Sequence, residues 1–514
     1  MKLALVISLL VCLAEAQYEF PEGFQFGVAT ASYQIEGAWN VDDKGENIWD
    51  HMTHERSGLI ADGSTGDDAC KAYFKTTEDI ELLKELGVDF YRFSISWSRI
   101  LPTGHASKLN THGINYYNDL INQLLAAEIT PVVTMFHWDL PQPLQEIGGW
   151  PNPFLADIFV DYANVLYREF GDRVKDWITF NEPMQICEQG YSVADKAPAY
   201  TQEGIGGYLC AHTLLIAHGK AYRLYNQVYR EEQQGRVGIT IDTGFAVPAS
   251  DSPADLEASE QNMEMNYGWY ANPIFSTDGD YPEIMKTRIA QLSTDEGFPY
   301  SRLPSFTDEE IEMLKGSSDF LGLNHYTSGV CSPITDTNGL RRPSHYADVG
   351  VSCVQPGEWE DSGSSWLKVY PEGLRMLLVW IHEHYNAPEI IITENGFSDI
   401  TGTLEDCRRI NYYNSYLEEV LKAIHDDGVN VTGYTAWSFM DNFEWRRGYT
   451  ERFGIYHVDF EDDDRPRTRK MSSHVYENII RTKKIDWDYP VPGFPACDWG
   501  GEEEDEEEEG EGEK

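Results

Sequence analysis

Residues 177–183 read Trp-Ile-Thr-Phe-Asn-Glu-Pro, a short apolar run that stops at a polar triplet. Residues 391–396 follow the same plan, as Ile-Ile-Thr-Glu-Asn-Gly. Short apolar runs that are rich in β-branched and aromatic residues, and that end at turn residues, are typical of buried strands. The two runs therefore predict two buried strands, each of which carries a Glu next to an Asn at its carboxyl end.

Eight runs of this kind alternate with helical patterns along the chain. They span residues 25–31, 89–96, 130–136, 176–180, 236–242, 319–325, 389–393 and 430–437. The clearest helical patterns span residues 77–86, with Thr76 or Thr77 as the N-cap, 113–127, and 410–426, with Gly428 just past the end.

Eight strand–helix units predict an α/β fold with a parallel sheet, and eight is the number that closes a single (β/α)8 TIM barrel. The long polar connections, residues 38–68, 243–315 and 328–365, are expected to be loop insertions. A doubly wound open sheet is the alternative. Nucleotide chemistry on that fold would need a Gly-rich phosphate turn after the first strand, and none follows residue 31.

The two ends of the chain are not expected to belong to the barrel. An apolar run at residues 3–13, followed by Ala-Glu-Ala at 14–16, predicts a signal peptide over residues 1–16. The run is too short to span a membrane. Residues 501–514 form an acidic tail that is expected to be disordered. The barrel domain is therefore assigned to residues 17–500 of a secreted, extracellular protein, with the gut lumen as one such location.

The net charge is −47, from 39 basic and 86 acidic residues. A surface of this sign repels phosphate backbones and anionic lipid, so neither nucleic acid nor a membrane is expected as a partner. Aromatic residues make up 13% of the chain. Aromatic faces bind the apolar faces of sugars, although they also fill cores. A small-molecule partner is the remaining expectation.

The chain has eight Cys, of which Cys12 leaves with the signal peptide. The odd number that remains leaves at least one thiol unpaired within the monomer. Cys331 and Cys353 bracket a polar loop, and we expect them to form a disulfide. No Cys-x-x-Cys pair occurs and the His residues are scattered, so neither a metal site nor a cofactor is expected. Asn430 begins a glycosylation sequon at a strand start.

Glu182 and Glu394 are the candidate catalytic residues. One such Glu could be a solvated loop residue, but two at the ends of separate strands point to a shared site, because the carboxyl ends of barrel strands build the active site. Two facing carboxyl groups suit glycoside hydrolysis, in which one protonates the leaving oxygen. Their mutual repulsion raises one pKa. A separation of about 5 Å would mean retention, and about 6.5–9.5 Å would mean inversion.

Seven motifs in order along residues 19–485 resemble glycoside hydrolase family one, the retaining β-glycosidases, and among them the secreted insect-type β-glucosidases. Besides the two Glu motifs, they are Ala-Ser-Tyr-Gln-Ile-Glu-Gly at 31–37, Tyr-Arg-Phe-Ser-Ile-Ser-Trp at 91–97, His-Trp-Asp-Leu-Pro at 137–141, Gly-Leu-Asn-His-Tyr at 322–326 and Trp-Ser-Phe-Met-Asp-Asn-Phe-Glu-Trp at 437–445.

The resemblance implies a role for each matching residue. Glu182 would be the acid/base and Glu394 the nucleophile. Arg92 would support Glu394, together with Tyr326. The implied substrate-binding residues are Gln34, His137, Asn181, Asn324, Tyr326, Trp437, Glu444 and Trp445. Within this set, Asn181 would hold the sugar 2-hydroxyl and Trp437 would stack beneath the ring.

The resemblance also implies the substrate class: an exo-acting β-glucosidase that tolerates β-galactose or β-fucose and acts on disaccharides or plant glucosides. Glu444 would disfavour 6-phosphosugars. By the same resemblance, the leaving-group side would be lined by Trp366, Glu188, Gln189, Lys196 and Phe453. Two alternatives remain. An insect-type thioglucosidase (myrosinase) keeps both Glu, although residues 184–189 hold no basic residue for a sulfate. A non-catalytic glycan-binding homologue would lack a catalytic Glu, and this chain has both.

Overall fold

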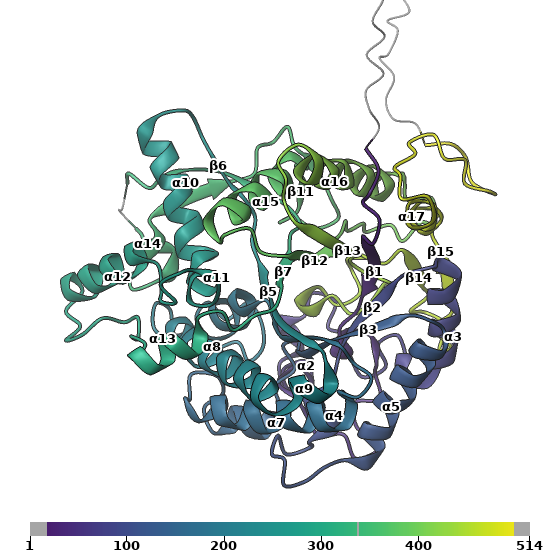
Figure 1. Cartoon of the computed structure of the whole chain (residues 1–514), viewed down its shortest axis with the longest axis horizontal. Coiled ribbons are helices and arrows are strands. Elements are labelled where there is room, and N and C mark those ends of the chain that lie inside the picture. Colours follow the sequence, from purple (N-terminus) through teal and green to yellow (C-terminus); the bar gives the residue numbers. More distant parts are fainter. Residues whose placement is uncertain (1–17, 337–338, 498–514) are drawn as a thin grey trace, which may run out of the picture.

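The eight predicted strands form, and they close into one parallel barrel in the order β1-β13-β12-β7-β5-β4-β3-β2 (Figure 1). The computed structural model describes residues 18–336 and 339–497, so the expected signal peptide and acidic tail lie outside the described residues. The closed order confirms the TIM barrel and excludes the doubly wound open sheet. The barrel strands are β1 (Gln25–Ala29), β2 (Phe90–Ser94), β3 (Thr130–Phe136), β4 (Asp176–Asn181), β5 (Arg236–Asp242), β7 (Leu321–Asn324), β12 (Ile390–Asn395) and β13 (Val431–Ala436).

Helices surround the barrel and cover its outer face (Figure 1). The main ones are α3 (Ala72–Leu86), α5 (Thr111–Ala126), α7 (Phe154–Phe170), α8 (Gly206–Leu224), α15 (Glu372–His384), α16 (Cys407–His425) and α17 (Met471–Thr482). Shorter helices at the strand connections are α1 (Ser32–Ile35), α2 (Ile48–Glu55), α4 (Trp97–Ile100), α6 (Gln142–Glu146) and α9 (Arg230–Gln233), with single turns at η1 (Ser57–Leu59), η2 (Gln185–Gln189), η3 (Tyr225–Tyr229) and η4 (Trp445–Arg447).

The predicted N-cap of α3 is wrong. The helix begins at Ala72, and Lys75 breaks its regular dihedral angles with φ −118° and ψ 18°. Thr76 therefore lies inside the helix, where its hydroxyl donates to the Ala72 carbonyl at 3.4 Å. Because Ser and Thr hydroxyls bond to nearby backbone both at caps and inside helices, their presence alone does not fix where a helix starts.

Two of the long connections are more than loops. Residues 243–315 hold β6 (Ala246–Pro248), α10 (Pro253–Asn266), α11 (Gly268–Phe275), α12 (Glu283–Asp295) and α13 (Asp308–Leu314). The connection at residues 328–365 holds β8 (Gly329–Pro333), α14 (His345–Val349), β9 (Val351–Val354) and β10 (Glu360–Asp361), and β11 (Lys368–Val369) follows just after it. Strands β6, β8 and β9 form a small sheet, and α10–α14 lie together on one side of the barrel, at the left in Figure 1.

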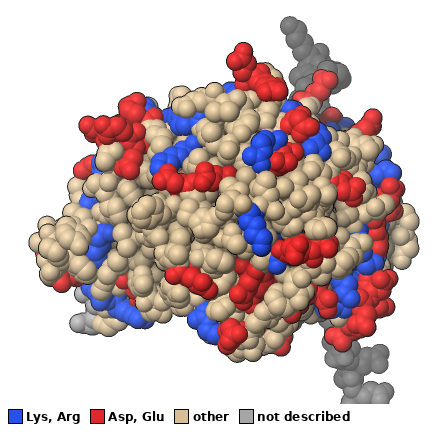
Figure 2. Space-filling model, turned by 90° about the horizontal axis from the view of Figure 1, so that it is seen from below, with Lys and Arg blue, Asp and Glu red and all other residues tan. Residues whose placement is uncertain are grey.

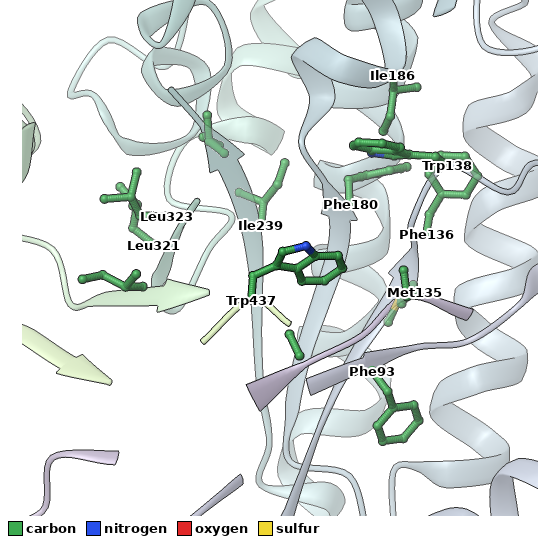
Figure 3. Packing of buried hydrophobic residues seen from close by; sticks show 14 of the residues in the cluster. Phe93, Met135, Phe136, Trp138, Phe180, Ile186, Ile239, Leu321, Leu323 and Trp437 are labelled. Carbon is green, nitrogen blue, oxygen red and sulfur yellow. The ribbon is translucent and has the colours of Figure 1, made fainter. Parts of the chain in front are cut away.

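Large aromatic side chains fill the space between the strands and the helices. Phe180 of β4 packs on Phe159 of α7, with ring centroids 4.4 Å apart, and on Phe136 of β3 at 5.9 Å. Figure 3 shows Phe136, Phe180 and Trp138 close together beside the barrel wall. All four of these side chains are buried. The packing fixes the ends of β3 and β4, where three candidate site residues stand: His137, Asn181 and Glu182.

The disulfide prediction is confirmed, and two further bonds are present. Cys331 pairs with Cys353 across β8 and β9. The others join Cys187 to Cys210 and Cys407 to Cys497. Cys70 is a free, buried thiol.

Charged residues are spread over the face seen in Figure 2, where Lys and Arg alternate with Asp and Glu and do not gather into a basic patch. Among residues 18–336 and 339–497, no helix is both long enough and apolar enough to cross a bilayer.

A buried ion pair anchors the segment that follows β13. The Lys470 ammonium lies 2.8 Å from Asp441, and both side chains are fully buried. Burial alone would raise the pKa of Asp441, but Lys470 and His457 outweigh it and hold that pKa well below its usual range. Asp441 stands three residues before Glu444. The pair therefore fixes the backbone that carries Glu444 to the site.

Lys470→Ala should lower the free energy of unfolding by about 3–5 kcal/mol, because it leaves a buried carboxylate unpaired. Because the folded pKa of Asp441 is depressed, the pair stabilises the fold above the unfolded pKa of about 3.9, and its contribution is lost as the pH falls below that value. Urea unfolding at several pH values measures both effects. Lys84→Ala, which breaks the exposed pair with Glu81, is the control and should cost about 0–1 kcal/mol. A deficit in Lys470→Ala that does not shrink in acid would contradict this account.

Candidate active site

Glu182 and Glu394 line one cavity of about 1360 Å³ at the carboxyl ends of the strands. Glu182 directly follows β4, and Glu394 is the next-to-last residue of β12. Both side chains are buried, with exposed fractions of 7% and 3%. The barrel thus brings together two carboxyl groups that are far apart in the sequence, as the strand-end pattern predicts.

Both oxygens of Glu394 accept hydrogen bonds. The Arg92 guanidinium of β2 donates to one oxygen at 2.6 Å, and the Tyr326 hydroxyl donates to the other at 2.7 Å. Burial and the negative Glu394 raise the pKa of Tyr326, so the phenol keeps the proton that it donates. These contacts fix the carboxylate in orientation, as a nucleophile requires. The predicted contacts of Arg92 and Tyr326 with Glu394 are present.

Glu182 has a different environment. Its backbone lies in the left-handed region, with φ +54°, and its N–H donates to the Thr240 carbonyl of β5 at 3.0 Å. One carboxyl oxygen accepts from the Asn324 amide at 2.6 Å. Burial raises the pKa of Glu182 well above its ordinary value, and the negative charges of Asp242 and Glu394 add to the effect. These surroundings therefore favour the protonated form of Glu182, the form that a general acid needs.

Asn181 contacts both the Arg92 that binds Glu394 and the Asn324 that binds Glu182. Its carbonyl oxygen accepts from Arg92 at 2.6 Å and from Asn324 at 3.1 Å. Its amide nitrogen is therefore the donor, and it lies 3.0 Å from Nε2 of His137. Burial, then the charge of Arg92, lowers the pKa of His137 far below its ordinary value, so the ring is neutral. With Nε2 as acceptor, the proton resides on Nδ1, which has no partner within the described part of the chain.

Gln34 and Glu444 meet at a second side of the cavity. The Gln34 amide donates to Asn442, to the Phe443 carbonyl and, at 3.4 Å, to Glu444. Burial and the neighbouring Glu451 raise the pKa of Glu444 to about 8. At neutral pH this carboxyl group is therefore largely protonated and offers both a donor and an acceptor. Charge repulsion between Glu444 and a sugar phosphate is therefore weaker than the sequence predicts.

Aromatic rings form the rest of the wall. Trp445 packs on Trp138 at 4.4 Å and is stacked with His137 at 5.9 Å. Trp437 lies within the buried core seen in Figure 3 and also lines the cavity. At the outer end, Trp366 is half exposed and lies parallel to Phe453, with ring centroids 6.4 Å apart. The predicted leaving-group residues Trp366 and Phe453 thus do line the cavity.

Glu188 is also predicted on the leaving-group side, but it does not line the cavity. The single turn η2 directs it toward α8, where its Oε2 lies only 2.6 Å from the position a Cβ on Gly207 would take. Burial raises the pKa of Glu188 to about 7. The neighbours Gln185 and Gln189 face the cavity instead. The sequence could not show this, because the turn decides which of these residues points inward.

Gly396 explains the end of the second Glu motif. A Cβ at this position would lie 1.8 Å from the carbonyl oxygen of Trp437. Only glycine lets β12 and the end of β13 approach this closely. The strand pair thereby holds Glu394 and Trp437 in one wall of the cavity.

Two cavity residues, Trp138 and Asp242, were missing from the predicted site, and Lys196, which the resemblance assigns to the leaving-group side, lies beside Trp138. Trp138 donates from its indole nitrogen to the Asn181 carbonyl at 3.0 Å, and the Lys196 ammonium lies 4.6 Å above the Trp138 ring. Asp242, the last residue of β5, lines the cavity beside Glu182. The rule that strand ends build the site would have found Asp242.

The family model for glycosyl hydrolase family 1 matches residues 16–485. Myrosinase 1 of the aphid Brevicoryne brassicae is 47% identical over 470 residues, which cover 91% of this chain and 99% of the relative.

Solved structures agree with this match. An aphid myrosinase aligns with a TM-score of 0.87 and 46% identity, covering 91% of this chain and all of that one (100%). A rice β-glucosidase mutant in a covalent complex with Glc aligns with a TM-score of 0.84 and 39% identity, covering 89% of this chain and 98% of that one. Since the family model spans nearly the whole described barrel, and since the closed barrel and the paired Glu residues fit it, the chain belongs to glycosyl hydrolase family 1.

Proposed function

We propose that this protein is an exo-acting, retaining β-glucosidase that releases terminal β-glucose, and also β-galactose or β-fucose, from disaccharides or plant glucosides. The observation that carries the proposal is the asymmetry of the two Glu residues in one cavity. Glu394 is paired with a guanidinium, whereas burial and like charges keep a proton on Glu182. A nucleophile and an acid in one cavity are what retaining glycoside hydrolysis needs.

In the first step, a Glu394 oxygen attacks the anomeric carbon while Glu182 gives its proton to the glycosidic oxygen. The bond between the anomeric carbon and that oxygen breaks, the leaving alcohol departs and the sugar stays esterified to Glu394. In the second step, Glu182, now a carboxylate, takes a proton from a water that attacks the same carbon, and the ester bond to Glu394 breaks. Two inversions give net retention.

The remaining residues position the sugar. Asn181 would hold the 2-hydroxyl, a contact that strengthens as charge develops at the anomeric carbon. Unpartnered polar atoms of Gln34 and His137 are the buried groups that would bind further hydroxyls. Glu444 and Trp445 would complete this set, with Trp437 beneath the ring. The covalent Glc complex of the rice relative supports a glycosyl-enzyme on this scaffold.

We also propose that the protein is secreted. Three disulfides support an oxidising compartment, since such bonds are rare in the cytosol. The predicted signal peptide supports the same conclusion.

A thioglucosidase is the second candidate, and two observations favour it. The similar aphid proteins are named myrosinases. Lys196 lines the cavity and makes no ion pair within the described residues, so it is available to an anionic leaving group. A panel of cellobiose, an aryl β-glucoside and a glucosinolate decides between the two. Faster cleavage of the glucosinolate would replace the main proposal.

Glu394→Gln should abolish turnover, because an amide is a poor nucleophile. With 2-deoxy-2-fluoro-β-glucosyl fluoride, the wild-type protein should accumulate a sugar ester on the peptide that contains residue 394, detected by mass spectrometry. The variant should carry no label. Glu405→Gln, at an exposed site in the connection after β12, is the control and should label normally. Label on any other carboxyl group would refute the assignment of the nucleophile.

Glu182→Ala should slow poor leaving groups far more than activated ones, because only poor leaving groups need the proton. We expect a loss of about 10²–10⁴-fold on cellobiose and a much smaller loss on 2,4-dinitrophenyl β-glucoside. Azide should restore turnover of the latter and give β-glucosyl azide, identified by NMR. Equal losses on both substrates, with no rescue, would count against an acid role.

Asn324→Ala should move the alkaline limb of the kcat/KM–pH profile to higher pH. The Asn324 amide donates to Glu182 and so favours its charged form; without it, the pKa of Glu182 rises and the active, protonated form persists to higher pH. The shift should be about one pH unit. Asn262→Ala, at a cavity residue on α10, is the control and should leave the limb in place. A limb that moves to lower pH would show that this hydrogen bond does not set the pKa.

A further inference from the structure

The leaving-group side of Glu182 carries a carboxylate that the mechanism above does not use. Asp242 ends β5, the strand next to β4, and the two strands pair Thr240 with Asn181. Because Glu182 donates its backbone N–H to Thr240, the side chains of Glu182 and Asp242 leave adjacent strand ends. Both line the same cavity.

Only one of the two Asp242 carboxylate oxygens has a hydrogen-bond partner among the described residues. One oxygen, Oδ2, accepts from the Gln185 amide at 2.7 Å. The other, Oδ1, is buried and has no hydrogen-bond partner among the described residues. Buried polar atoms nearly always have a partner, since an unmade hydrogen bond costs free energy. Gln185 thus holds Asp242 in one orientation and leaves Oδ1 without a partner in a residue that lines the cavity.

Other charged groups at the cavity are already compensated. Asp195 pairs with Arg446 at 3.1 Å, Glu451 with Arg447 at 3.2 Å, and Glu394 with Arg92. Glu182 and Glu444 have raised pKa values and hold protons. Within the described chain, this leaves Asp242 as a carboxylate and Lys196 as an ammonium without an ion-pair partner at the cavity.

Asp242 is ionised at neutral pH. Burial raises its pKa to about 6, and Glu394 also acts in that direction, whereas Gln185 and Lys196 act against it. At pH 7 its free oxygen is therefore a charged acceptor. Hydrogen bonds to charged acceptors are stronger than those between neutral groups.

The walls around this acceptor suit a polar ring. Asn262 and Asn266 of α10 line the same cavity, and Asn266 is held by the His345 ring at 2.9 Å. The aromatic rings of Trp366 and Phe453 form another part of the wall. A cavity lined by both aromatic faces and polar groups matches a sugar, whose ring has apolar faces and a hydroxylated edge.

We propose that Asp242 is a specificity-determining residue whose free Oδ1 accepts a hydrogen bond from a hydroxyl of the leaving group. The enzyme then favours leaving groups that are themselves sugars and disfavours leaving groups that carry an anion beside Glu182. This inference rests on the proposed β-glucosidase function and names the leaving-group class that the site selects.

Asp242→Asn tests the inference with two substrates of equal chemical difficulty. Cellobiose and cyclohexyl β-glucoside both release a poorly acidic secondary alcohol from a ring, so both need the proton of Glu182, but only cellobiose offers leaving-group hydroxyls. We expect kcat/KM for cellobiose to fall about 10- to 100-fold, as for the loss of a hydrogen bond to a charged group. The value for cyclohexyl β-glucoside should change by less than about threefold.

The second readout uses charge. In Asp242→Asn, kcat/KM for 4-carboxyphenyl β-glucoside should rise severalfold relative to phenyl β-glucoside, because the repelling charge is gone. Glu257→Gln removes an exposed carboxylate from α10 and should leave all four substrates unchanged.

Other outcomes overturn the inference. If cellobiose and cyclohexyl β-glucoside fall together, Asp242 acts through the proton of Glu182; if neither changes, it contacts no leaving group. If Asp242→Asn does not fold, Gln185→Met decides, since it frees Asp242 from its orientation and should raise KM for cellobiose alone. A wild-type protein that cleaves none of these glucosides would instead refute the proposed function.

Discussion

The buried guanidinium of Arg92 is the interaction on which the site depends. Arg92 starts from β2 and is 1% exposed. It donates to Thr134 of β3, to Asn181 of β4 and, across the barrel, to Glu394 and the Thr393 carbonyl of β12. A buried charge is tolerated only when it is paired and its donors are satisfied. The strand ends must therefore hold one spacing, and at that spacing Glu394 and Glu182 line the same cavity.

The fold could be predicted from the sequence because its strands are local patterns. The runs at 130–136 and 236–242 coincide with β3 and β5 in both bounds. The count of eight then selects the closed barrel, because strands of a barrel have no edges to leave open. That Glu182 and Glu394 share one cavity could be predicted for the same reason: a Glu at the end of a strand needs only the strand and its direction.

Other features depend on contacts that no local pattern contains. The start of α3 was misplaced because the kink at Lys75 belongs to its tertiary surroundings. Glu188 was placed in the cavity because a residue in a turn after a strand can face either way, and the contact with Gly207 of α8 decides it. The resemblance predicts Lys196 on the leaving-group side, but its position over the Trp138 ring is a contact between two separate loops that no local pattern contains. Asp242, by contrast, stands at the end of a predicted strand and fits the strand-end rule, although no motif marks it.

The order of strands around the barrel gives Glu182 and Glu394 different surroundings, on which their proposed roles as acid and nucleophile rest. Glu182 and Glu394 are the same residue type, and both are buried, so burial alone cannot distinguish them. Strand β4 lies next to β5, whose last residue is the acid Asp242, and this like charge adds to the burial that keeps Glu182 protonated. Strand β12 lies next to β7, after which Tyr326 donates to Glu394, while Arg92 reaches it from across the barrel. The chemistry of this cavity is therefore a property of the strand order as much as of the two Glu residues themselves.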